Sequence, residues 1–199
     1  SFVKCLFIEN KTDYFYKTRL LNKMAKLSKT PIIASYDSDV LMYPNQYVAA
    51  ASSIRNGFFD FCYPFNKPLK HIEKQHFKII KETLDLHKVD SLSVITHQGV
   101  PPGGCLFMNK DKFIEAGMEN ENFISWGPED QERIERVKIL GYKTGSIEGY
   151  LFHMDHIITH NSSYSNPLYR HNLKEFEKVK RMTKEQLKDY IKTWSHLNG

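Results

Sequence analysis

Cysteine and long apolar segments are both scarce in this 199-residue sequence. Cys5, Cys62 and Cys105 are its only cysteines, and their spacing does not match a cysteine-based metal site. Isolated cysteines of this kind are typical of free thiols in a reducing compartment, so we expect a cytoplasmic protein. No stretch approaches the ~18 apolar residues of a membrane-spanning helix, which argues against an integral membrane protein.

A strong charge of one sign is also missing. The 28 Lys and Arg residues exceed the 23 Asp and Glu residues by a net +5, and the lysines are spread along the chain without forming one dense block. This balance predicts no nucleic-acid partner, and it suits an anionic substrate or a membrane surface equally well. Because 41% of the residues are hydrophobic and no repeat or low-complexity linker is present, we expect a globular domain with a substantial core.

Apolar periodicity predicts strands that alternate with helices, which indicates an α/β fold. The helix after Pro128 is the clearest, because Ile134, Val137 and Leu140 recur on one face and Gly141 can end it. Expected strands cover residues 1–10, 32–36, 59–63, 91–96, 104–109 and 150–156. Expected helices cover residues 12–27, 44–56, 69–88, 110–117 and 128–140. The buried face of the first consists of Phe15, Leu20, Leu21, Met24 and Leu27. Two basic helices are expected at the C-terminal end, the second capped by Thr183 and Gln186.

Two carboxylates, Asp37 and Asp39, directly follow the apolar run at residues 31–35. Asp side chains often accept backbone hydrogen bonds where a strand turns, which is a purely structural explanation. Carboxylates at the C-terminal edge of a strand also hold divalent cations, often together with substrate phosphates. The pattern by itself leaves both interpretations open.

Two more polar clusters have similar alternatives. Glu129 and Asp130 fall in the first turn of a helix, where acidic side chains are favoured by the helix dipole, and Trp126 could be a core residue. His153 and His156 lie three residues apart in a short strand or turn, where histidines are commonly structural. None of these clusters identifies a function by itself.

The order of these features resembles that of the nucleotide-sugar glycosyltransferases of the GT-A fold. The shared order is a strand, Asp-Ser-Asp, Gly-Gly before a strand, Trp-Gly-Pro-Glu-Asp opening a helix, and Tyr-Leu-Phe-His. Its nearest counterparts are the inverting family-2-like enzymes and the C-terminal half of the galactosyltransferases, over residues 15–156. The most specific part is "GGCLFMNKDKFIEAGMENENFISWGPEDQERIERVKILGYKT". The resemblance implies a GT-A-type, Rossmann-like mixed sheet flanked by helices.

The resemblance assigns a metal and nucleotide site to two segments. Asp37 and Asp39 resemble the family's DxD motif, in which the final Asp binds Mn²⁺ or Mg²⁺ and the first holds the ribose or the metal. His153 resembles the histidine that completes this metal site, and His156 is a further candidate. A cation suits the chemistry because charge builds on the leaving diphosphate, and an imidazole ligand favours Mn²⁺ over Mg²⁺.

The resemblance also assigns acceptor and donor contacts. Asp130 resembles the general base that takes a proton from the acceptor hydroxyl, and a hydroxyl needs such a base within hydrogen-bond reach. Glu129 would hydrogen-bond the acceptor or hold the loop, and Trp126 would stack on a sugar ring. Gly103 and Gly104 would let the backbone approach the donor.

One departure concerns the start of the chain. Family members usually open with a βαβ unit that cradles the uracil, whereas residues 1–10 correspond to the third strand of that half. We therefore expect an incomplete N-terminal part, with an exposed sheet edge that favours homodimerisation. The catalytic domain is expected to cover residues 1–160, and residues 161–199 are expected to form a C-terminal loop and helices on the same domain. The basic helices, between Lys174 and Lys192, either face solvent or contact a membrane surface.

The function expected from the resemblance is transfer of a sugar from a UDP-linked donor to a glycan or lipid-linked acceptor. A second alternative is a sugar- or nucleotide-binding remnant without catalytic activity. A third is a metal-dependent phosphohydrolase built on Asp37, Asp39, His153, His156 and His160. The donor sugar, the acceptor and the linkage depend on pocket contacts that this sequence does not place.

Overall fold

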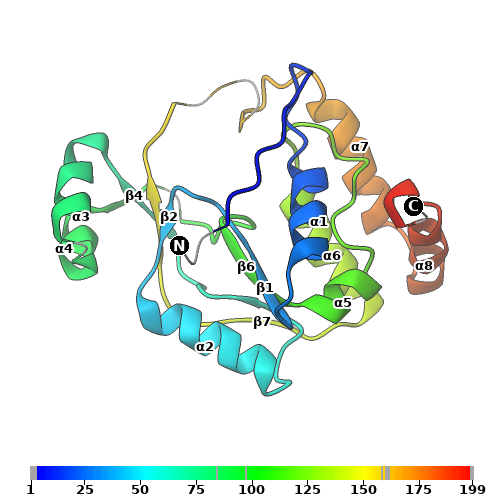
Figure 1. Cartoon of the computed structure of the whole chain (residues 1–199), viewed down its shortest axis with the longest axis horizontal. Coiled ribbons are helices and arrows are strands. Elements are labelled where there is room, and N and C mark those ends of the chain that lie inside the picture. Colours follow the sequence, from blue (N-terminus) through cyan, green and yellow to red (C-terminus); the bar gives the residue numbers. More distant parts are fainter. Residues whose placement is uncertain (1–3, 84, 97, 158, 160–161, 198–199) are drawn as a thin grey trace.

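The computed structural model describes residues 4–83, 85–96, 98–157, 159 and 162–197, and these form two mixed β-sheets with helices packed around them (Figure 1). The first sheet has the order β1-β6-β3-β7, with β6 antiparallel to both neighbours and β3 parallel to β7. Its strands are β1 (Ile32–Tyr36), β6 (Cys105–Asn109), β3 (Phe61–Tyr63) and β7 (Thr144–Ser146). The expected α/β class with a mixed sheet is therefore confirmed.

The second sheet is smaller in area and carries part of the candidate site. Its order is β2-β8-β4-β5, with β8 antiparallel to β2 and parallel to β4. Its strands are β2 (Val40–Leu41), β8 (Leu151–Met154), β4 (Leu69–Ile72) and β5 (Val94–Ile95). The expected strand at 91–96 is reduced to β5 because the preceding helix continues to Leu92.

Helices flank both sheets, with α3 and α4 at one end of the molecule and α7 and α8 at the other (Figure 1). Alternate residues of β6 separate two cores: Leu106 and Met108 pack with α5, α6, α7 and α8, whereas Phe107 packs with α2. No helix in the described ranges combines the length and apolar character needed to cross a bilayer. The helices are α1 (Lys17–Leu27), α2 (Pro44–Arg55), α3 (Phe77–Thr83), α4 (Leu86–Leu92), α5 (Lys110–Glu115), α6 (Glu129–Leu140), α7 (Tyr169–Lys180) and α8 (Lys184–Lys192), with short 3₁₀ turns at Lys74–His76 and Ser195–Leu197.

The α6 helix follows the sequence prediction closely. Pro128 is its N-cap residue, and Ile134, Val137 and Leu140 are buried in the main core. Gly141 ends the helix in a left-handed conformation with φ of 90°, which a residue with a side chain rarely adopts. The capping box of Thr183 and Gln186 at the start of α8 is also present.

The expected N-terminal strand is wrong over residues 4–10, and residues 1–3 lie outside the described part of the chain. Residues 4–16 contain no helix or strand, and the Phe7 side chain is 91% exposed. The first helix begins at Lys17 because the side chain of Asn10 donates to the carbonyls of Thr12 and Tyr14, which holds a turn in competition with the helix. The β1 strand lies at the edge of its sheet.

The buried face expected for the first helix is wrong at three of its five residues, since only Leu20 and Leu21 are half-buried. Met24 and Leu27 are exposed, as is Phe15 just before the helix, while the polar residues Thr18 and Asn22 face inward. Asn22 accepts from the Glu119 amide at 2.7 Å and donates to its carbonyl at 3.0 Å. These tertiary hydrogen bonds satisfy polar atoms that apolar periodicity would have placed in solvent.

The expected helix at 69–88 divides into β4, a 3₁₀ turn, α3 and α4. Leu69 to Ile72 pair with β8 in parallel register, and His71 lies opposite His153. Asp85 then starts α4 by accepting hydrogen bonds from the amides of His87 and Lys88. Sheet pairing has overridden the lysine-rich helical pattern at the start of this segment.

A fully buried arginine links α6 to the segment after α5. Arg136 donates to Glu132 at 2.8 Å and to the carbonyls of Ala116 and Met118, and its guanidinium lies over the Trp194 ring. Because Arg136 and Glu132 are both buried, each charge depends on the other for compensation.

We predict that Arg136→Met lowers the free energy of unfolding by about 3–5 kcal/mol, because it leaves the Glu132 carboxylate buried without its partner. Urea unfolding followed by circular dichroism measures the change. Lys138→Met is the matched control on the same helix, since Lys138 forms only an exposed pair with Glu135 and should change stability by less than about 1 kcal/mol. Equal stability of the two variants would contradict the buried ion pair.

Candidate metal and carboxylate site

Asp39, His153 and His156 form the one group of possible metal ligands found among the described residues. Backbone pairing between β2 and β8 places Val40 opposite His153, and the Met154 amide donates to the Asp39 carbonyl at 2.8 Å. One ligand atom from each of the three side chains lies within 4.8 Å of the other two. The sheet thus brings together residues more than a hundred positions apart in the sequence.

The two histidines present ring nitrogens to the same carboxylate oxygen. Nε2 of His156 lies 3.1 Å and Nε2 of His153 lies 3.5 Å from Asp39 Oδ2. Nδ1 of His156 is 3.1 Å from the Ile157 carbonyl, which can only accept, so this nitrogen carries the proton. Nε2 of His156 then either donates a hydrogen bond to Asp39 or, without a proton, can bind a cation together with the Asp39 carboxylate.

The environment of His153 favours its neutral form. Burial lowers the pKa of His153, and the nearby histidines lower it further, while Asp39 opposes the shift. The His71 ring stacks on His153 with ring centroids 6.0 Å apart. A neutral imidazole is the form that binds a metal, and one carboxylate with two histidines is a ligand set that suits divalent transition metals.

Asp37 does not join this group, although it was expected to share the coordination sphere with Asp39 and His153. Its amide donates to the Gly104 carbonyl at 2.9 Å, and its carboxylate lies 3.7 Å from the ammonium of Lys17. Burial raises the pKa of Asp37, and Lys17 opposes that shift. Of the four metal candidates named from the sequence, Asp39, His153 and His156 therefore lie together, and Asp37 lies beside Lys17.

Lys17 is a central residue of the site that sequence reasoning missed. From the first turn of α1, its ammonium lies 3.3 Å from Asp130 and 3.4 Å from Glu129, in addition to its contact with Asp37. Burial alone would lower the pKa of Lys17, but the three carboxylates outweigh it and raise the pKa above its ordinary value. No local pattern marks this lysine, because its partners on α6 are more than a hundred residues away.

Glu129 and Asp130 have opposite electrostatic environments. Burial would raise the pKa of Asp130, but the charges of Lys17 and Arg133 outweigh it, and the pKa lies below its usual range. Arg133 donates to Asp130 at 2.6 Å and to the buried Glu119 at 2.5 Å. Burial and the neighbouring Asp130 charge instead raise the pKa of Glu129. Glu129 Oε2 is buried and has no hydrogen-bond partner among the described residues.

The two glycines contribute through packing. A Cβ atom on Gly103 would lie 2.5 Å from Asp130 Oδ2, so only glycine leaves room for this carboxylate. A Cβ atom on Gly104 would lie 2.6 Å from a methyl group of Leu151, the first residue of β8. Both glycines therefore let the segment just before β6 lie close to Asp130 and to the start of β8.

Trp126 is half-buried and belongs to an aromatic cluster. Its ring stacks on Tyr169 with centroids 5.5 Å apart, and the ring of Tyr164 meets it edge-on at 4.9 Å. Asn172 donates to the Trp126 carbonyl at 2.9 Å and fixes the segment before α6. Tyr164 and Tyr169, which the sequence interpretation did not select, extend the aromatic surface predicted at Trp126.

Neither a protein-family model nor a curated protein sequence matches this chain.

We predict that Asp39→Asn and His156→Ala each weaken Mn²⁺ binding by more than about 100-fold, because each removes a direct ligand. Loss of a residue that only hydrogen-bonds a metal ligand costs roughly 10–100-fold. Titration followed by electron paramagnetic resonance of free Mn²⁺ measures this affinity. Asp37→Asn is the matched control, since it removes the same charge two residues away and should leave Mn²⁺ affinity within a few fold. A larger loss in Asp37→Asn than in His156→Ala would restore the original assignment of Asp37 as a ligand.

Proposed function

We propose that this chain is a metal-dependent inverting glycosyltransferase that moves a sugar from a UDP-linked donor to a hydroxyl group of a glycan or lipid-linked acceptor. The observation that carries the proposal is the position of Lys17, which contacts Asp37 beside the metal triad and both carboxylates at the start of α6. Lys17 therefore links the two carboxylates at the start of α6 to Asp37, which lies two residues before Asp39 of the triad.

The triad suits the donor side of this reaction. Asp39, His153 and His156 would hold Mn²⁺, because the set combines one hard oxygen with two imidazole nitrogens, whereas Mg²⁺ prefers oxygen ligands alone. When bound, such a cation neutralises negative charge on a departing diphosphate. Their partial exposure leaves all three side chains accessible to a ligand.

Asp130 is the proposed base. Its pKa lies below the usual range, so the carboxylate is ionised near neutral pH and has lone pairs for a proton, while Lys17 and Arg133 weaken its affinity for that proton. In the proposed step, the acceptor oxygen attacks the anomeric carbon of the donor, the bond from that carbon to the diphosphate oxygen breaks, and the hydroxyl proton passes to Asp130. Displacement in a single step inverts the anomeric centre, which requires a base and no covalent intermediate.

Glu129 and the aromatic cluster are proposed to hold the acceptor. The buried Oε2 atom of Glu129 can accept a hydrogen bond from a sugar hydroxyl, which would supply the partner that it lacks among the described residues. Trp126, with Tyr164 beside it, offers aromatic surface for packing against a sugar ring. Trp126 and Glu129 lie within four residues of Asp130 in the sequence, and Tyr164 contacts Trp126.

The phosphohydrolase alternative has less support. It needs a larger set of clustered ligands, but Asp37 pairs with Lys17 and His160 lies outside the described residues. The alternative of an inactive remnant is separated by assay. Incubation with a panel of nucleotide sugars and Mn²⁺ should release nucleoside diphosphate only when an acceptor is added, whereas a hydrolase would release phosphate without one and a remnant would release nothing.

We predict that Asp130→Asn lowers the transfer rate by about 10²–10⁴-fold while Mn²⁺ and donor affinity stay within a few fold, because the amide keeps the shape of the side chain and loses its basicity. Release of nucleoside diphosphate measures the rate, and calorimetry measures binding. Asp111→Asn is the matched control, since Asp111 also lies in the first turn of a helix but is exposed.

A near-normal rate in Asp130→Asn would exclude Asp130 as the base. Glu129→Gln would then be the decisive variant, because Glu129 is the other carboxylate at this position. A parallel loss of donor affinity in Asp130→Asn would instead assign Asp130 to donor binding.

A further inference from the structure

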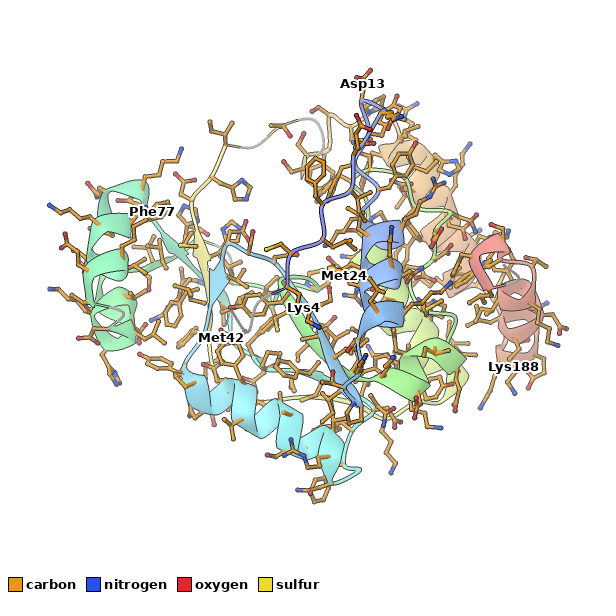
Figure 2. The ribbon with its side chains drawn as sticks, viewed as in Figure 1. Lys4, Asp13, Met24, Met42, Phe77 and Lys188 are labelled. Carbon is orange, nitrogen blue, oxygen red and sulfur yellow. The ribbon has the colours of Figure 1, made fainter. Side chains whose placement is uncertain are left out.

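The positive charge of the protein is concentrated in its last two helices. Residues 170–192 contain eight Lys and Arg residues and four Asp and Glu residues, and so carry +4 of the net +5 of the whole chain. Both helices lie at the outer edge of the molecule, and Lys188 is seen there on α8 (Figures 1 and 2). The remaining residues carry a net charge of +1, so most of the net charge belongs to these helices.

Four of the cations form one stripe on α7 and the residue that follows it. Arg170, Lys174, Lys178 and Arg181 are all exposed, and they are spaced four, four and three residues apart. At about 100° per residue they fall within about 80° of one another, and at about 1.5 Å per residue they extend over about 16 Å. The opposite face of α7 is occupied by buried Asn172, Phe176 and Val179.

The surface along this stripe is hollowed. A shallow hollow of about 420 Å³ is lined by Leu173, Lys174, Glu177, Lys178 and Arg181. The Lys178 ammonium is held 3.7 Å from the centre of the Tyr190 ring, and Arg181 lies 3.4 Å from Glu177. Leu173 is 37% exposed and adds an apolar patch between the cations. This combination suits a ligand that carries negative groups on a partly apolar framework, as an acidic sugar chain does.

The aromatic cluster of the candidate site lies at the start of the same helix. Tyr169 is the first residue of α7, and its ring stacks on Trp126, which precedes Asp130 by four residues. Tyr164 contacts both rings and is 76% exposed. Tyr169 precedes Leu173 by four residues, about one helical turn, so the aromatic cluster adjoins the hollow at Leu173. A chain with one sugar at this cluster can reach the cations by way of Leu173.

We propose that the stripe of Arg170, Lys174, Lys178 and Arg181 binds the distal part of an anionic oligosaccharide acceptor whose terminal sugar lies at Trp126 and Tyr164. The acceptor role rests on the proposed glycosyltransferase function, whereas binding of an anionic glycan by the stripe does not. The acceptor class follows from charge complementarity, because carboxylate or phosphate groups on the glycan would pair with these cations.

An anionic membrane is less well matched to the same surface. The apolar faces of α7 and α8 are buried against the core through Phe176, Val179, Leu187 and Ile191, so neither helix can insert a face into lipid. A flat charged surface would also engage the cations of α8 as much as those of α7. The position of the stripe next to the aromatic cluster favours an elongated ligand.

The test compares two triple variants of the full chain with equal loss of charge. Lys174→Gln, Lys178→Gln and Arg181→Gln together remove the stripe, and Lys184→Gln, Lys188→Gln and Lys192→Gln together are the matched control on α8. The probes are an oligogalacturonate, a neutral maltooligosaccharide of the same length, and vesicles containing phosphatidylglycerol. Calorimetry at low and high salt measures binding, and thermal unfolding verifies that both variants fold.

We expect oligogalacturonate to bind in preference to the neutral chain, and the α7 variant to bind it about tenfold more weakly or worse. The α8 variant should stay within about twofold, and high salt should abolish the preference by screening. Equal binding of the charged and neutral chains, or equal weakening in the two variants, would overturn the proposal. Binding to vesicles without binding to oligogalacturonate would also overturn it and would assign the surface to a membrane.

The Asp39→Asn variant separates this inference from the proposed function. Oligogalacturonate binding is measured without metal or donor, so it should persist in Asp39→Asn even if no transfer activity is found in any variant. Conversely, transfer to neutral acceptors that is unaffected by the α7 variant would keep the glycosyltransferase function and reject the anionic acceptor.

Discussion

Two buried or nearly buried cations, Lys17 and Arg133, hold the acidic start of α6, and the geometry of the site depends on them. Arg133 bonds to Glu119 and Asp130 inside the protein, and Lys17 reaches the same Asp130 from another helix. A charge left unpaired at this depth is strongly destabilising, so these partners cannot move independently. The pairing joins α1, α6 and the segment after α5, and it fixes the Asp130 carboxylate before any ligand arrives.

The second constraint is the register of the smaller sheet. Pairing of β8 with both β2 and β4 places His153 beside Asp39 and against the ring of His71. A shift of one residue would turn His153 to the opposite face of the sheet and dissolve the group of ligands. Strand pairing therefore positions the possible metal ligands, whereas ion pairs between helices position Glu129 and Asp130.

Glu129 and Asp130 show how two adjacent carboxylates acquire different chemical characters. Both are largely withdrawn from water, which by itself raises the pKa of each group. Asp130 contacts two cations and its pKa falls, while Glu129 contacts Lys17 alone and lies beside the Asp130 charge, so its pKa rises. Environments that separate the pKa values of neighbouring groups are common where proton transfer and hydrogen bonding to a substrate occur together.

Local sequence determined the elements whose signals act over a few residues. Pro128, the apolar face of α6 and Gly141 define one helix, and Thr183 with Gln186 starts another, because caps and helical periodicity operate within a turn or two. The clustering of Asp39 with His153 was also anticipated, although only through resemblance to a family. Tertiary structure alone decided the remainder. It turned residues 69–72 into a strand, left residues 4–10 unpaired, exposed Met24 while burying Asn22, and left Asp37 outside the group of Asp39, His153 and His156. Apart from residues 4–10, each of these outcomes depends on a partner far away in the sequence, as Lys17 does on Asp130, and no local pattern records such a partner.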